Sequence, residues 1–210
     1  MSNISTKRSA TRTAKNKTLA GTKNFFGIRA FNNRHDIIRD IKASHPEPEI
    51  HGNKIWKAAT LLVDFLEVDP PRKNTHVMDL GCGWGLSGIY CAQQHQARVT
   101  AVRFEKITAT DLEGVDEIIG SDICFWDELR DILYDVVQRA FDAGVQRVVL
   151  ADPGRSPFLE LVDRLNALYK TDLYEWDTSS PVTATGYVTE IFNVPNKNSN
   201  TKKQQRRRSR

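Results

Sequence analysis

A segment of seven residues, directly after a short apolar run, carries the pattern in this chain that is most suggestive of chemistry. Residues 79–85 read DLGCGWG, with glycine at every second position from Gly81 and an acid, Asp79, two residues before the first glycine. Glycine adopts left-handed backbone conformations freely, and without a side chain it lets a ligand lie close to the peptide groups. The pattern therefore predicts a turn that holds a ligand against the backbone.

Two glycine patterns overlap in this loop and indicate different ligands. Gly83, Gly85 and Gly88 satisfy G-x-G-x-x-G, in which a dinucleotide pyrophosphate rests on a helix N-terminus. That register, typical of a nicotinamide-dependent oxidoreductase, requires Leu80, Gly81 and Cys82 to be strand, and two of these positions suit a strand poorly. In the alternative, D/E-x-G-x-G-x-G, the strand ends at Leu80 and the backbone contacts a nucleoside that carries a cationic sulfonium. We favour the second register, and a purely structural turn remains an alternative.

The elements that must position this loop follow from the spacing of apolar residues. We expect helices over residues 50–68, from 86 to about 93, from 129 to about 144 and over 157–169, and strands over 76–80, 98–102, 115–121, 145–151, 172–177 and 186–194. Strands that alternate with helices predict an α/β fold, a Rossmann-like parallel sheet with helices on both faces and an antiparallel hairpin at its C-terminal end. A ligand is then expected at the carboxyl ends of the strands.

Charge is distributed unevenly along the 210 residues. Eight of the 30 Lys and Arg residues lie in residues 1–35 and seven in residues 196–210, and neither segment contains an acid. The 15 that remain face 26 acidic residues, so residues 36–195 carry a net charge of −11. We predict one folded domain over 36–195 and disordered basic tails over 1–35 and 196–210, because the tails have too few apolar residues to offset the chain entropy.

The composition also limits the compartment. No apolar run approaches the roughly 20 residues that span a bilayer, so we expect no membrane contact. A secretory signal is absent, and three cysteines without a C-x-x-C pair indicate a reducing compartment and no metal site. We predict a cytoplasmic protein, with nuclear and mitochondrial locations as the alternatives that the basic ends suggest.

Four segments in order resemble the seven-strand S-adenosylmethionine-dependent methyltransferases. DLGCGWG looks like the first motif of that family. HGNKIWKAATLLVDFLE (51–67), GSDICFWDEL (120–129) and ADPGR (151–155) are similar to segments of its small protein-lysine methyltransferases, a subgroup that includes enzymes acting on the electron-transfer flavoprotein β-subunit. The second of these segments contains a D-x-x-Y/F motif, here Asp122–Phe125.

The resemblance implies a cofactor, S-adenosyl-L-methionine, and a set of site residues. The residues expected at the cofactor are Trp56, Asp79, Gly81, Cys82, Gly83 and Ser121, and Asp122 is the candidate catalytic residue, at the entrance for the target amine. Two of these have ordinary structural alternatives. Trp56 is equally suited to a core position on an amphipathic helix, and Asp122 to capping the helix that follows it. Trp126 and Phe125 are suited either to a substrate rim or to ordinary packing, and Arg155 to a loop ion pair.

The connection after the second strand is too short for the family pattern. About a dozen residues separate Val102 from Val115, whereas a helical crossover to a parallel strand needs roughly 30. The family's ribose-binding acid is also absent, because Arg103 and Phe104 follow Val102. We therefore predict that one strand and one helix are missing. Either residues 98–108 run on as one strand and an apolar face of the sheet is exposed, which we favour, or Glu105 takes the ribose role.

Two functions from different classes remain open. The first is an S-adenosylmethionine-dependent methyltransferase that acts on a protein lysine amine, for which an acidic body suits a basic target segment. The second is a catalytically impaired protein of the same fold whose basic tails bind RNA or an acidic partner. The intact glycine loop favours the first function, and the short connection after Val102 favours the second.

Overall fold

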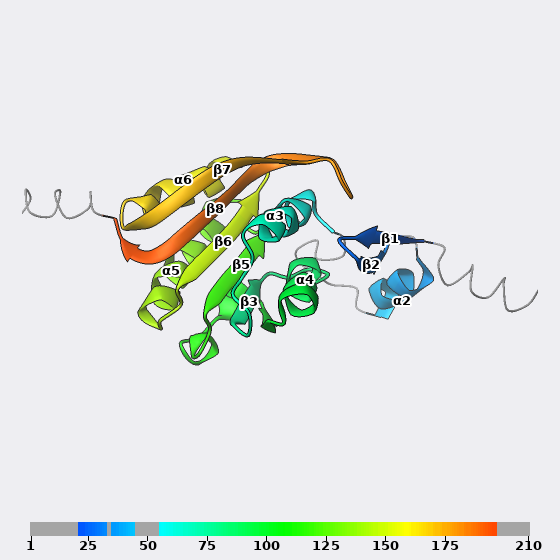
Figure 1. Cartoon of the computed structure of the whole chain (residues 1–210), viewed down its shortest axis with the longest axis horizontal. Coiled ribbons are helices and arrows are strands. Elements are labelled where there is room, and N and C mark those ends of the chain that lie inside the picture. The colour runs from blue at the N-terminus through cyan, green and yellow to red at the C-terminus, as the bar shows by residue number, and fades with distance from the viewer. Residues whose placement is uncertain (1–20, 33–34, 45–54, 197–210) are drawn as a thin grey trace, which may run out of the picture.

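The computed structural model describes residues 21–32, 35–44 and 55–196 of the chain. Its helices are α2 (Asp36–Ser44), α3 (Lys57–Val68), α4 (Leu86–His95), α5 (Asp127–Asp142) and α6 (Ser156–Asn166). Its strands are β1 (Thr22–Phe25), β2 (Ile28–Phe31), β3 (His76–Leu80), β4 (Arg98–Val102), β5 (Glu117–Ser121), β6 (Arg147–Asp152), β7 (Tyr169–Thr178) and β8 (Ala184–Pro195). Figure 1 shows these elements along the chain.

The main sheet has the predicted mixed architecture. Its six described strands lie in the order β4-β3-β5-β6-β8-β7. The first four run parallel to one another, and β8 pairs antiparallel with β6 and with β7. The α/β class, the parallel sheet and the C-terminal antiparallel hairpin are therefore confirmed.

Helices cover both faces of this sheet, because side chains alternate along each strand. On one face, Val77, Ile119 and Val149 pack with α3 and α4. On the other, Met78 and Ile118 pack with α5 and α6. The strands are thus buried on both sides, as parallel sheets usually are.

The connection between β4 and β5 contains no strand and no α-helix. It forms two 3-10 turns, Phe104–Lys106 and Thr110–Leu112. The sheet therefore lacks a strand after β4, as the short spacing predicted, but the expectation of one continuous strand over 98–108 was wrong. The expectation of an exposed apolar face was also wrong, since Phe104, Ile107 and Leu112 are buried against the α5 side of the sheet.

An N-terminal hairpin corrects part of the predicted disordered tail. Strands β1 and β2 pair antiparallel around Gly27, within the segment that we assigned to the tail over 1–35. Phe25 and Ile28 are buried in the core of α3 and α4, and Phe26 meets Tyr90 of α4 edge to face. In Figure 1 the hairpin lies beside α4. These three apolar residues hold a short strand pair that isolated hairpins rarely sustain. The rest of the predicted tails lies outside the described residues.

Helix α3 begins later than the sequence predicted. It starts at Lys57, with Trp56 as its extended N-cap residue, rather than near residue 50. Residues 50–54 of the predicted helix lie outside the described part. Among the described helices, none combines the length and the apolar character that crossing a membrane requires.

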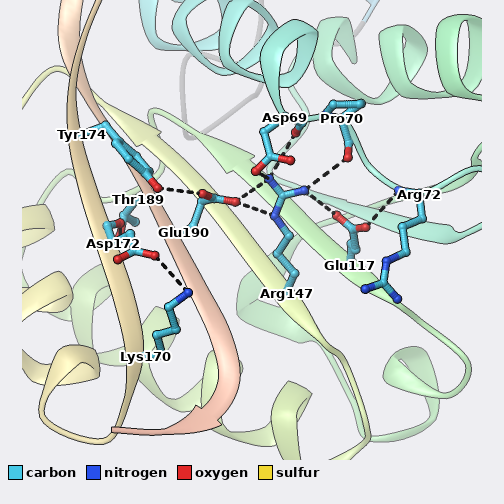
Figure 2. Close-up of polar contacts among 10 residues, drawn as sticks. All are labelled: Asp69, Pro70, Arg72, Glu117, Arg147, Lys170, Asp172, Tyr174, Thr189 and Glu190. Carbon is cyan, nitrogen blue, oxygen red and sulfur yellow. Dashed lines mark hydrogen bonds and ion pairs between the residues drawn. The ribbon is translucent and has the colours of Figure 1, made fainter.

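A buried arginine at the start of β6 joins the start of β5, the second half of β8 and the chain after α3, as Figure 2 shows. The Arg147 guanidinium contacts Glu190 of β8 at 2.5 Å, Glu117 of β5 at 3.4 Å and Asp69 after α3 at 3.0 Å. It also donates to the backbone carbonyl of Pro70 at 3.5 Å. Burial raises the pKa of Glu117 and of Glu190, and Arg147 opposes this effect in both. The network fixes the end of the sheet opposite the glycine loop.

We predict that Arg147→Met destabilises the protein by about 3–5 kcal/mol at pH 7.5, because it leaves buried carboxylates without their cation. The loss should shrink at pH 5, where Glu117 and Glu190 take up protons more readily once the arginine is gone. Urea unfolding at the two pH values measures both effects. Arg39→Met, which breaks an exposed ion pair with Asp36, is the matched control and should change little. A pH-independent loss would contradict the assignment.

Candidate functional site

The glycine loop follows β3 directly and is built from left-handed residues. The strand ends at Leu80, as the sulfonium register requires, and Gly81, Gly83 and Gly85 have φ values of 60°, 53° and 72°. The Gly85 amide donates to the carbonyl of Cys82 at 2.7 Å, which closes the turn before α4 begins. Gly81 and Gly83 are exposed, so their peptide groups are accessible to a ligand.

Asp79 lies beneath this turn rather than beside it. Its carboxylate is buried and accepts a hydrogen bond from the amide of Gly88, in the first turn of α4, at 3.0 Å. Burial raises the pKa of Asp79 to about 7, and the Gly88 hydrogen bond only partly offsets this. The side chain thus joins the end of β3 to the start of α4, and it positions the loop from inside.

One side of Gly81 is closed by two apolar side chains. A Cβ added at Gly81 would lie 2.8 Å from Cγ2 of Ile123 and 3.5 Å from the ring of Phe104. Both residues are buried. The loop after β3 therefore packs against the loop after β5 and against the first 3-10 turn of the short connection. The other side of Gly81, together with Gly83, is exposed and remains accessible to a ligand.

The loop after β5 carries the predicted acceptor-site acid. Asp122 has a left-handed backbone, with φ at 57°, and its amide donates to the carbonyl of Ala151 at 2.9 Å. Its buried carboxylate is 2.5 Å from Nη2 of Arg155. The same guanidinium bonds the buried carboxylate of Asp152 at 2.7 Å through Nη1. Arg155 therefore bridges two acids from neighbouring loops, which confirms the loop ion pair expected for it.

Aromatic side chains lie beside this ion pair. The Arg155 guanidinium stands 4.5 Å from the ring centroid of Phe125. Trp56 meets Phe125 edge to face at 6.1 Å, and Trp126 tilts against Phe125 at 5.7 Å. The side chain of Trp126 is 50% exposed, so one large aromatic surface faces solvent at this end of the sheet. We call Trp56, Phe125 and Trp126 the aromatic cluster.

The structure brings most of the predicted site residues to one edge of the sheet. Ser121 ends β5, and Asp122 precedes the Ile123 that packs on Gly81. Cys82 is half-buried in the loop, and burial, followed by the charge of Asp79, raises the pKa of its thiol, so it is a poor nucleophile.

Three further residues lie at the carboxyl ends of the strands but were not predicted from the sequence as site residues. They are Phe104, which packs on Gly81, Asp152, which shares Arg155 with Asp122, and Tyr187 of β8, whose ring lies against Gly154. Only Asp152 left a signal, because its carboxylate accepts from the amides of Gly154 and Arg155, a local turn that Asp-Pro-Gly favours.

The residues present fit a nucleoside cofactor in part. The exposed backbone at Gly81 and Gly83 offers a surface that a side chain would fill, and Ser121 lies at the same edge. The end of β4 does not offer the expected ribose-binding acid. Arg103 stands there, and the nearest acid along the chain, Glu105, contacts Arg103 at 4.0 Å. The open side of the glycine loop is therefore the part that suits the ligand.

Comparison with known families matches part of the chain to a methyltransferase family. Residues 38–139, just under half of the chain, match the family described as lysine methyltransferase. The matched segment contains the glycine loop, the short connection and the Asp122–Phe125 motif. The match implies S-adenosylmethionine as the methyl donor.

Individual relatives are distant. A sphingolipid C9-methyltransferase from Candida albicans is 30% identical over 66 residues, which are 31% of this chain and 12% of that enzyme's length. The chain thus spans a small part of that relative. Solved structures with some likeness include the METTL16 methyltransferase domain (10% identity, 88% of this chain and 91% of that one, TM-score 0.45). Another is precorrin 8W decarboxylase from Methanobacterium thermoautotrophicum (15% identity, 62% and 87%, TM-score 0.41). These scores are too low to support an argument about function.

We predict that Asp79→Asn removes part of the pH dependence of stability. The folded pKa of Asp79, about 7, exceeds the unfolded value of 3.8. Its contribution is therefore fully present below about pH 4 and is lost as the pH rises through 7. Between pH 5 and 7 the wild type should lose stability relative to Asp79→Asn by up to about 1.4 kcal/mol per pH unit. Urea unfolding at several pH values tests this, with the exposed Glu113→Gln as the control. Parallel curves for wild type and Asp79→Asn would refute it.

Proposed function

We propose that this protein is an S-adenosylmethionine-dependent methyltransferase that methylates lysine amines of a protein substrate. One observation carries the proposal. The exposed left-handed residues Gly81 and Gly83 lie at the carboxyl end of β3, where Gly81 packs against the loop that contains Asp122–Phe125. Both features fall inside the segment that matches the lysine methyltransferase family.

The chain's part in the reaction is to bind and to orient. S-adenosylmethionine supplies an electrophilic methyl group on a sulfonium. The backbone of residues 81–83 would hold the nucleoside, with Ser121 and Trp56 contributing from the neighbouring elements. No nucleophilic side chain is needed, because the acceptor amine itself attacks and positioning accounts for most of the rate. This agrees with the raised pKa of Cys82, which keeps its thiol protonated.

The charge at the acceptor end favours an amine. Asp122 and Asp152 carry two negative charges and share one guanidinium, that of Arg155, so the pair of loops keeps one net negative charge. Such a site attracts an ammonium group. A substrate seated against the rings of Phe125 and Trp126 would displace water there, and this desolvation would favour the neutral amine that can accept a methyl group.

The partner that we propose is a basic protein segment. The net charge of −11 over residues 36–195 attracts lysine-bearing chains and repels nucleic acid. Weak nucleic-acid contact by the basic ends, and a cytoplasmic location, stay predictions, because residues 1–20 and 197–210 lie outside the described part. The alternative of an impaired binding protein depends on those same residues and on the short connection after Val102, whereas the match to the lysine methyltransferase family favours the enzyme.

Cofactor binding is tested by calorimetric titration with S-adenosylhomocysteine. We expect a dissociation constant below about 1 mM, and loss of detectable binding in Gly83→Arg. Gly114→Arg is the matched control, since Gly114 is also exposed and left-handed, with φ at 67° and open space where its Cβ would be. It introduces the same side chain and similar strain far from the site. Equal effects of the two variants would contradict the assignment of the loop.

The acceptor is tested with the methyl-labelled donor and a cell extract. We expect label on protein lysine, and none when the extract's lysines are blocked beforehand. Label confined to RNA or to small molecules would refute the acceptor while leaving the cofactor assignment intact.

The aromatic cluster should act on the acceptor and not on the cofactor. We predict that Trp126→Ala lowers kcat/KM for the labelled protein about tenfold, roughly 1.4 kcal/mol, with unchanged affinity for S-adenosylhomocysteine. Leu173→Ala removes an exposed apolar side chain of β7 and should leave both quantities unchanged. An equal fall in cofactor affinity for Trp126→Ala would place this ring at the cofactor instead.

A further inference from the structure

Strand β4 forms one edge of the sheet, and no described element pairs with its outer side. The residues that follow it, 103–116, turn onto the α5 side of the sheet and do not extend it. Arg98, Thr100 and Ala101 are exposed, and Val99 and Val102 are half-buried. The missing strand therefore leaves a free edge composed mostly of β-branched residues.

The two edges of the sheet are protected very differently. The opposite edge, β7, carries Lys170, Asp172, Glu175 and Asp177, and its pairing with β8 contains a register shift at Tyr169. Charges and bulges of this kind are how proteins prevent a sheet edge from pairing with another chain. Strand β4 has no bulge, no proline and one charge. That charge, on Arg98, is directed to Nδ1 of His76 at 2.8 Å.

The backbone groups that face outward can be identified from two hydrogen bonds. The Arg98 amide donates to the carbonyl of Thr75 at 2.9 Å, and the carbonyl of Val102 accepts from the amide of Gly81 at 2.9 Å. Backbone groups alternate along a strand, so residues 98, 100 and 102 face β3. Val99 and Ala101 then present their N–H and C=O groups to the free edge. Among the described residues, no hydrogen bond is seen to the N–H or C=O group of either residue.

We propose that two copies of this chain pair through β4, antiparallel, about a two-fold axis at Thr100. In that register Val99 of each copy faces Ala101 of the other, and the two pairs exchange all four free hydrogen bonds. Thr100 of one copy faces Thr100 of the other, which is a favourable cross-strand pair. Arg98 faces Val102, so no like charges are opposed. In this register both outward-facing residues of each copy bond to the other copy, and the one charge of β4 lies opposite an uncharged residue.

The interface is small, so we expect a concentration-dependent dimer that a covalent link can trap. Thr100→Cys places two thiols on the axis, where Cα atoms of an antiparallel non-hydrogen-bonded pair lie about 4.5 Å apart. Ala101→Cys is the matched control. Its two copies would be about 8 Å apart, beyond disulfide reach, although the position is equally exposed. Both variants carry Cys82→Ser, because Cys82 is the one native cysteine that is not fully buried.

The result expected is disulfide-linked dimer from Thr100→Cys at least tenfold faster than from Ala101→Cys, measured on non-reducing gels under mild oxidation. Adding Ala101→Pro to Thr100→Cys should abolish the link, since proline removes an outward N–H without touching the β3 ladder. Circular dichroism confirms that this variant folds. Sedimentation of the wild type should show mass rising with concentration. Equal rates for the two cysteines, or a wild type that stays monomeric at all concentrations with no trapped dimer, would overturn the proposal.

Discussion

The hydrogen bond between the Gly88 amide and the buried carboxyl of Asp79 sets the geometry of the loops at the carboxyl ends of the parallel strands. It brings the first turn of α4 so close to β3 that a Cβ at Gly88 would lie 2.9 Å from Asp79 Oδ2 and from Val99 Cγ1. The chain must reverse within the few residues between Leu80 and Leu86. Left-handed glycines allow this reversal. The exposed peptide groups at Gly81 and Gly83 follow from a constraint that lies below them.

The elements of the sheet were predictable because apolar periodicity reports burial directly. Strands β3 and β4 were predicted to the residue, and α4, α5 and α6 to within a few residues. The glycine loop was also predictable, because D-x-G-x-G-x-G ends its strand at Leu80 for steric reasons that do not depend on tertiary contacts. The hairpin at 22–31 was not, because its stability comes from Phe25 and Ile28 docking on α4. A composition argument averaged these residues with the basic segment before them.

The detailed chemistry of the edge was less predictable, because it depends on contacts between loops that are distant in sequence. The sequence placed Asp122 at the site but did not show that Arg155 neutralises half of the charge that Asp122 and Asp152 carry together. It identified Trp56 but not its ring contact with Phe125. Nor did it show that Phe104 closes one side of Gly81. An apolar residue after a strand has no local signature that distinguishes core packing from a site wall.

The short connection after β4 affects the interior of the sheet and its edge strand β4 differently. Three apolar side chains, Phe104, Ile107 and Leu112, are enough to cover the face that a helix would otherwise bury, since hydrophobic packing needs area and no particular element. Backbone hydrogen bonds are different, because each outward N–H and C=O of β4 needs a partner at a fixed spacing along a strand. Side chains from a 3-10 turn cannot provide that ladder. The apolar surface that a further strand and helix would cover is therefore buried by other side chains. The outward backbone N–H and C=O groups of Val99 and Ala101, however, can be satisfied only by water or by another extended chain.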